Sequence, residues 1–168
     1  MLTQGCQQPV VFLRSKSETM TQKTTPATPV LFFTTRTTLK ELPNYVVKVA
    51  KELYAEAVAN DLLPTGPLHW VYIGADGKPG TVFTLEIALP VSGPLKKESL
   101  FLEKELPSFT SLSAIHNGAW DHLYETYEKL MDEVAVKGNQ LSGICRELYH
   151  RIDLNDPQNN ITEVQVGI

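Results

Sequence analysis

The chain has 168 residues, of which 42% are hydrophobic and 20% charged, with a formal net charge of −4. This length suits a single domain with its own core, and the mild acidity disfavours broad nucleic-acid binding. No apolar run approaches the roughly 20 residues that a membrane span needs, and the unlike contexts of Cys6 and Cys145 predict a cytoplasmic protein without a disulfide framework.

Residues 1–28 carry little that a core could bury. The segment 15–26 is rich in Ser, Thr and Lys, which is typical of a flexible arm. A short apolar patch, Pro9–Leu13, could add an edge strand, but a secretory signal would need a longer apolar stretch after basic residues. We therefore expect a flexible arm over residues 1–28 and one domain over residues 29–168.

The first half of that domain, about residues 29–91, predicts the order β-α-β-β. Runs of β-branched and apolar residues indicate the strands, and apolar residues at three- and four-residue spacing indicate the helix. The expected elements are a strand over Pro29–Arg36, a helix over Leu39–Asn60, and strands over Leu68–Gly74 and Val82–Val91.

The second half, about residues 106–168, predicts the same order. Gly138 follows the apolar stripe of the helix and is a plausible stop, since glycine is common just past helix ends. The expected elements are a strand over Ser108–His116, a helix from about Ala119 to Val136, and strands over Ile144–Ile152 and Ile161–Ile168.

The two halves match at an offset of 77 residues, without a gap from about residue 31 to the C-terminus. We therefore predict an α+β domain made of a duplicated β-α-β-β unit with pseudo-twofold symmetry. An antiparallel sheet would carry the helices on one face, with a ligand cleft between the halves. Identical residues at matching places include Phe32 and Phe109, Leu53 and Leu130, Gly66 and Gly143, Tyr72 and Tyr149, and Glu86 and Glu163.

Strand alternation sorts the side chains into two faces. In the last strand, Val164 and Val166 point one way and Glu163 and Gln165 the other. We expect the apolar set to pack on the helices and the opposite face to be mixed. The mixed face is expected to carry six side chains of the two central strands: Leu68, Trp70, Tyr72, Cys145, Glu147 and Tyr149.

Glu147 stands among aromatic residues in this arrangement. A carboxylate buried without a partner is costly, so it takes up a proton or binds a cation, and Trp and Tyr ring faces attract the same cation. Trp120, at the start of the second helix, either covers the cleft or only packs. The alternative is that Glu147 pairs with Arg146 or Arg151 and that the aromatic residues are core.

The four histidines do not follow a metal-binding pattern such as His-Glu-x-x-His. We expect them to be structural or surface residues, and we expect no metal and no cofactor. Cys145 has no histidine beside it on its face, so a small apolar filler is the better interpretation.

Three motifs resemble those of GyrI-like effector-binding domains. The stretch Gly118–Leu130 resembles the entry to the second helix of that family, with its glycine, aromatic, leucine and tyrosine positions. The stretch Gly143–Tyr149 resembles the family's "G-x-x-x-E-x-Y" strand, and Thr162–Val166 resembles its closing "T-E-[IV]-Q-[IV]" strand. The resemblance covers about residues 29–168, and it implies a duplicated β-α-β-β fold with a cleft between the halves.

The resemblance implies a ligand-sensing module of multidrug-responsive transcription regulators. The family's ligand-contacting glutamate maps to Glu147 and its adjoining tyrosine to Tyr149. Residues 1–28 are too few for a DNA-binding domain, so we expect a stand-alone domain with a small-molecule ligand, no direct nucleic-acid contact and no membrane contact. Two alternatives stay open: a hydrolase of reactive xenobiotics with Glu147 as general base and Tyr149 or Tyr72 as proton donor, and a protein-interaction module that binds a regulator or gyrase.

Overall fold

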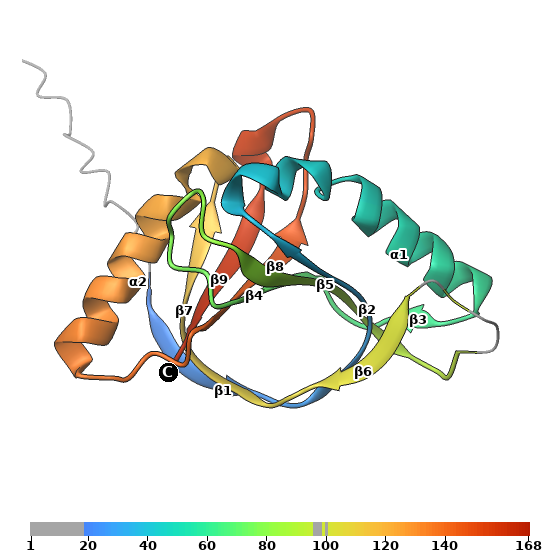
Figure 1. The fold of residues 1–168 in the computed structure, drawn as a ribbon, viewed down its shortest axis with the longest axis horizontal. Helices are drawn as coiled ribbons and strands as arrows, with labels where there is room; N and C mark the ends of the chain where they lie inside the picture. Colours follow the sequence, from blue (N-terminus) through green and yellow to red (C-terminus); the bar gives the residue numbers. More distant parts are fainter. Residues whose placement is uncertain (1–18, 96–98, 100) are drawn as a thin grey trace, which may run out of the picture.

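A computed structural model describes residues 19–95, 99 and 101–168, and it shows an α+β fold built on one antiparallel sheet (Figure 1). The strands run in the order β1-β7-β9-β8-β4-β5-β2-β6, and β3 pairs with β5. The strands are β1 (Thr21–Thr25), β2 (Thr28–Thr37), β3 (Leu63–Pro64), β4 (Leu68–Ile73), β5 (Phe83–Ser92), β6 (Leu102–Leu106), β7 (Phe109–Asn117), β8 (Ile144–Arg151) and β9 (Ile161–Gly167). The helices are α1 (Lys48–Ala59) and α2 (Leu123–Lys137), with short 3-10 turns η1 (Leu39–Asn44), η2 (Trp120–His122) and η3 (Pro157–Asn159).

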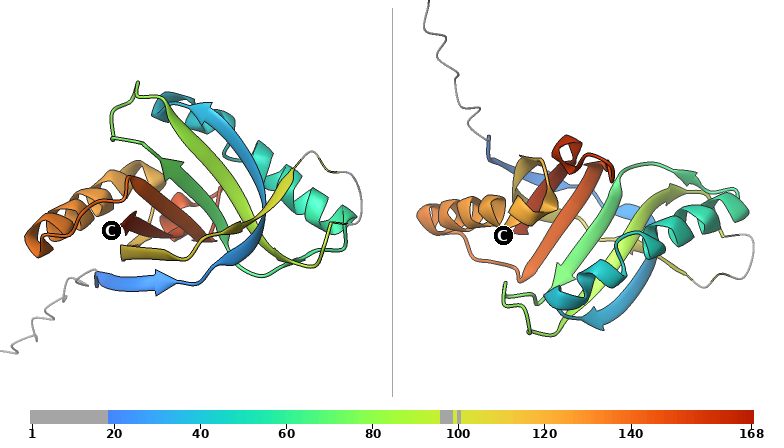
Figure 2. Two further views of the ribbon diagram at one scale, coloured as in Figure 1. Left: turned by 60° about the horizontal axis from the view of Figure 1, so that its bottom comes forward. Right: turned by 90° about the horizontal axis from the view of Figure 1, so that it is seen from above.

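Both α-helices cover the same face of the sheet, which we call the helix-side face. The right panel of Figure 2 shows α1 and α2 over the sheet, with β4 and β8 passing between them. The sheet curls away from the helices, so its other face, the inner face, lies inside a half-barrel (Figure 1). Within the described residues, no helix is long and apolar enough to cross a membrane.

Each helix contacts the sheet through one stripe of buried residues. Val49, Leu53 and Ala57 of α1 pack in one core cluster, and Leu130 and Val134 of α2 pack in a second. Gly138 ends α2 in the left-handed conformation, with φ of 67°, as its position after the stripe predicts.

The first helix begins later than the sequence predicts. Leu39–Asn44 forms a 3-10 turn and α1 starts only at Lys48. Pro43 lies inside the turn, where its missing N–H and its ring oppose an α-helical hydrogen bond. Glu41 Oε2 accepts from the Thr38 backbone N–H at 3.2 Å and fixes the start of the turn.

The arm expected over residues 1–28 is corrected at its C-terminal end. Thr21–Thr25 forms strand β1, which pairs with β7 at an edge of the sheet. Residues 1–18, including the apolar patch Pro9–Leu13, lie outside the described residues. The short strands β3 and β6 were not expected either.

The 77-residue offset fits the helices and the later strands of each half but not the first strands. The buried positions Val49, Leu53 and Ala57 correspond to the buried Thr126, Leu130 and Val134 at that offset. Leu31 pairs with Leu89, whereas the equivalent Val166 pairs with Leu112, so the first strands match at an offset of 81. The expectation of a gapless register is therefore wrong before the helices, and the duplication itself stays a prediction.

The face assignment of the central strands is also corrected. Trp70 lies opposite Ile87 on β5, and Glu147 lies opposite Val164 on β9. Directly opposed residues of antiparallel strands share a face. The six side chains predicted for the mixed face therefore lie on the helix-side face together with the apolar residues. They are Leu68, Trp70, Tyr72, Cys145, Glu147 and Tyr149. The polar residues Glu163 and Gln165 lie on the inner face.

Candidate functional site

Glu147 occupies the middle of the helix-side face, where the two halves of the sheet meet. It lies on β8 directly opposite Trp70 of β4, and its exposed fraction is 5%. β4 and β8 pass between the two helices (Figure 2). The Tyr127 hydroxyl of α2 reaches the Glu147 carboxylate from the helix side.

Three tyrosine hydroxyls donate hydrogen bonds to this carboxylate. Tyr72 of β4 and Tyr149 of β8 donate to Oε2 at 2.9 Å and 2.5 Å, and Tyr127 of α2 donates to Oε1 at 2.9 Å. The three donors come from three different elements, so the cage depends on the packing of α2 against the central strands. Among the described residues, no Lys, Arg or His nitrogen forms an ion pair with Glu147.

Burial sets the protonation chemistry of this cage. Burial raises the pKa of Glu147, and its effect outweighs the three tyrosine hydrogen bonds and the nearby His116, which all lower the pKa. Burial and the Glu147 charge also raise the pKa of each tyrosine well above 10, so the three hydroxyls keep their protons and act as donors. The site thus holds one acidic group that a neighbouring positive charge would keep ionised.

Aromatic rings cover the carboxylate on the side of the helices. Tyr149 meets Trp70 and Trp120 edge to face, with ring centroids 5.9 Å and 5.4 Å apart. Trp120 extends from η2 over this cluster, and its Nε1 donates to Thr162 Oγ1 at 3.2 Å. The indole is half-buried, so it forms the outer wall of the cluster.

A small cleft opens between these rings. Its cavity volume is about 20 Å³, close to what one water molecule occupies. Its walls come from both halves of the chain and from the turn that precedes α1. The lining residues are Val46, Leu68, Trp70, Trp120, Tyr149 and Ile152.

The structure brings together the residues that the sequence analysis proposed for the ligand site. Leu68, Trp70, Trp120 and Tyr149 line the cleft, and Tyr72 and Tyr149 hold Glu147. Their role in binding stays a prediction. Cys145 packs against both core clusters, and burial raises the pKa of its thiol to about 11, which makes it an uncharged filler.

Sequence reasoning missed Tyr127. Its position on the apolar stripe of α2 suggested a core ring, and its spacing gave no indication that the hydroxyl reaches Glu147. Val46 and Ile152, which line the cleft, were also not singled out.

None of the four histidines is hydrogen-bonded to Glu147, although His116 lies close enough to lower its pKa. His116 is bound to Thr126 Oγ1 and to the Ala119 carbonyl oxygen, both at 3.0 Å. His69 and His150 lie on β4 and β8, and His122 pairs with Glu125 at the surface. Within the described residues, no group of three or more His, Cys, Asp or Glu side chains is placed to hold a metal ion.

Solved structures of other proteins share this fold. The crystal structure of the EcmrR C-terminal domain matches with a TM-score of 0.76 and 22% identity, over 90% of this chain and 97% of that one. EcmrR in its cryo-EM complex with DNA matches with a TM-score of 0.73 and 23% identity, over 88% of this chain and 56% of that one. SAV2435 bound to tetraphenylphosphonium matches with a TM-score of 0.60 and 15% identity, over 90% of this chain and 93% of that one.

The sequence itself carries the family assignment. No curated protein sequence shows significant similarity to the chain. The model of the GyrI-like small molecule binding domain matches residues 18–168, which takes in all the strands and helices described above. The chain therefore belongs to the GyrI-like small molecule binding domain family.

Proposed function

We propose that the chain binds a lipophilic organic cation in the cleft, with Glu147 as the counter-charge. The observation that carries this proposal is the buried carboxylate, which has three neutral donors and no basic partner among the described residues. A buried carboxylate is stable when it is protonated or when a positive charge lies beside it. A cationic ligand would supply that charge.

The walls of the cleft define the rest of the ligand. Trp70, Trp120 and Tyr149 offer aromatic edges and faces, and Leu68 and Val46 offer aliphatic surface. Aromatic faces attract cations and cover apolar groups at once. An amphipathic cation with aromatic rings matches this lining. The relative SAV2435, whose structure holds tetraphenylphosphonium, supports the choice of that cation as a probe.

Binding requires the cleft to open. A cavity of about 20 Å³ is far smaller than the several hundred Å³ that drug-sized ligands occupy. Trp120 is half-buried, and one hydrogen bond to Thr162 holds its indole nitrogen. We infer that this indole moves outward when the ligand enters, and that the tyrosine hydroxyls keep their bonds to Glu147.

Intrinsic fluorescence gives a direct assay, because the two tryptophans of the chain both line the cleft. Titration with tetraphenylphosphonium is expected to change the emission saturably in the wild type. The Glu147→Gln variant is expected to bind more than about tenfold more weakly, since it loses the carboxylate that would pair with the cation. Equal affinity in the variant would sink the proposal.

Two controls separate charge from shape. Glu128→Gln removes an exposed carboxylate from α2 and should bind as the wild type does. Triphenylphosphine oxide, a neutral molecule with similar rings, should bind weakly to the wild type and Glu147→Gln alike. Mass spectrometry of the recovered phosphonium is expected to show an unchanged mass; an altered mass would instead favour the hydrolase alternative.

A further inference from the structure

The inner face of the sheet carries a second group of buried polar side chains, on the side opposite the cleft. All of them are at most 9% exposed, although they lie in strands that are otherwise rich in apolar residues. Burial of this much polar surface is costly unless each group has a partner. The residues are His69, Glu86, Ser111, Ser113, Arg146, Glu163 and Gln165.

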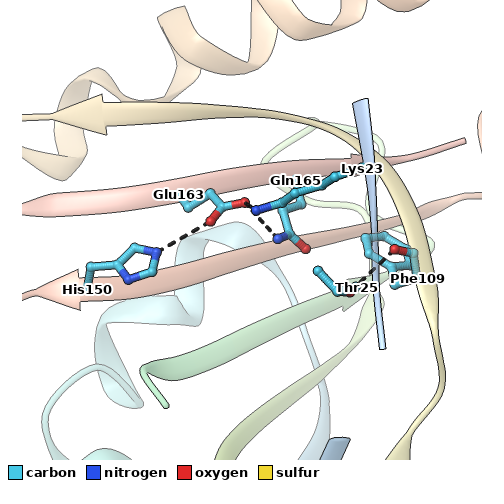
Figure 3. A network of polar contacts seen from close by, with 6 residues as sticks. All are labelled: Lys23, Thr25, Phe109, His150, Glu163 and Gln165. Atoms are coloured by element: carbon cyan, nitrogen blue, oxygen red, sulfur yellow. Dashed lines mark hydrogen bonds and ion pairs between the residues drawn. The ribbon is translucent and has the colours of Figure 1, made fainter. Parts of the chain in front are cut away.

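The two carboxylates of this face already have cations. Glu163 pairs with Lys23 of β1, accepts from Gln165 Nε2 at 2.8 Å and lies 3.4 Å from His150 Nε2 (Figure 3). Glu86 pairs with Lys104 of β6 at 2.5 Å. Both acidic groups of the inner face are therefore neutralised by lysines that come from the edge strands.

Arg146 has no carboxylate at ion-pair distance among the described residues, and the charge of Glu86 acts on it only from further away. Its Nη2 donates to the Pro107 carbonyl oxygen at 3.2 Å, and its guanidinium carbon lies 4.1 Å from the centroid of the Phe109 ring. Burial lowers the pKa of Arg146 to about 10, so the group stays charged at neutral pH. Among the described residues, no carboxylate forms an ion pair with it.

Three buried polar atoms without a hydrogen-bond partner lie on this arginine and on its neighbours in the sheet. They are Arg146 Nε, Gln165 Oε1 and Ser111 Oγ. Gln165 is the direct cross-strand partner of Arg146, and Ser111 lies one strand further on β7, the strand whose Phe109 the guanidinium contacts. Each such atom costs about 1–3 kcal/mol when it stays unpaired. Their position beside a cation without an ion pair indicates a ligand rather than three separate defects.

We propose that this part of the inner face binds a small oxyanion that carries a hydroxyl group, such as hydrogen phosphate or hydrogen carbonate. Arg146 supplies the positive charge and donates from Nε to an anion oxygen. The anion's hydroxyl donates to Gln165 Oε1, which cannot itself donate. Ser111 Oγ completes the set, since a hydroxyl can donate or accept.

Isothermal titration calorimetry of the full chain with inorganic phosphate and with hydrogen carbonate tests this site. At neutral pH the wild type is expected to bind one of them saturably and to bind sulfate more weakly, because sulfate carries no hydroxyl for Gln165. Arg146→Gln is expected to abolish binding. Arg151→Gln, which removes an exposed arginine from the same strand, should leave binding unchanged.

Ser111→Ala tests the site with less risk to folding than Arg146→Gln, because it deletes a single buried hydroxyl. It is expected to lower the affinity for the oxyanion about tenfold, which corresponds to the loss of one hydrogen bond to a charged group. Three results would overturn the proposal: no saturable oxyanion binding, equal affinity in Ser111→Ala, or equal affinity for sulfate. Water molecules would then be the hydrogen-bond partners of these polar groups. Glu147→Gln should retain oxyanion binding, so this test and that of the cation cleft fail independently.

Discussion

Replacement of Tyr127 by phenylalanine is expected to move the pH dependence of cation binding upward by about one unit. Tyr127 donates to Glu147 Oε1 at 2.9 Å, and both other tyrosines donate to Oε2. A hydrogen bond to a charged group contributes about 1.5–3 kcal/mol, against about 0.5–1.5 for a neutral one. The difference, about 1–1.5 kcal/mol, corresponds to about one unit in the pKa of the carboxyl.

The assay is the affinity of the phosphonium probe as a function of pH. Because the cation needs the ionised carboxylate, affinity is expected to rise with pH through the raised pKa of Glu147 and then to level off. In Tyr127→Phe the whole rise should occur at higher pH. The matched control is Tyr124→Phe, which removes an exposed hydroxyl from the same helix and should leave the rise in place.

Folding stability gives a check that needs no ligand. A carboxyl whose folded pKa is raised keeps its proton in the folded state after the unfolded chain has lost it. The contribution of Glu147 to stability is therefore present at pH values below 4.5, the ordinary pKa of a glutamate. It is lost as pH rises through the raised pKa of the folded state. Tyr127→Phe should extend this loss to higher pH in urea denaturation series. If Tyr127→Phe leaves the pH dependence of binding and of stability unchanged, or moves either to lower pH, the tyrosine hydrogen bonds do not control the pKa of Glu147.

Three further changes test other parts of the structure. Burial lowers the pKa of His69 to about 4, so the contribution of this residue to stability should fall by about 3 kcal/mol as pH falls from 6.5 to 4, and His69→Gln should lose less than the wild type in urea denaturation. An alanine Cβ at Gly167 would lie 2.8 Å from the Ile144 carbonyl oxygen, so Gly167→Ala should cost about 1–3 kcal/mol, and an unchanged melting temperature would contradict this packing. Thr162→Val frees the indole nitrogen of Trp120, so stopped-flow fluorescence should show faster phosphonium association; slower association would contradict Trp120 as the moving cover.

Periodicity predicted most of the elements because each helix and strand buries one stripe of side chains. The α1 stripe of Val49, Leu53 and Ala57 follows the predicted spacing, and so do Leu130 and Val134 of α2. The buried Thr126 of α2 is polar, so the apolar pattern does not mark it. The edge strand β1 escaped prediction because its five residues are polar and mostly exposed. Such a strand is held by main-chain pairing with β7, which leaves no hydrophobic pattern to read.

The face assignment failed for a different physical reason. Alternation separates Trp70 and Glu147 from their sequence neighbours, but it does not say which set meets the helices. In an ordinary two-layer fold the apolar set would decide this. Here both faces of β4 and β8 are largely buried, so the decision depends on cross-strand register, which pairs Trp70 with Ile87 and Glu147 with Val164. A register is a property of the whole sheet and cannot be read from one strand.

The central strand β8 carries opposite, unpaired charges on consecutive residues. Arg146 and Glu147 are each 5% exposed, and alternation sends one side chain to the inner face and the other to the helix-side face. The sheet thus keeps the guanidinium and the carboxylate from neutralising each other, although they are neighbours in the chain. A core shaped for stability alone would replace such charges with apolar groups or pair them, because an uncompensated buried charge is strongly destabilising. Under the two binding proposals, ligands of opposite charge on the two faces would remove both costs.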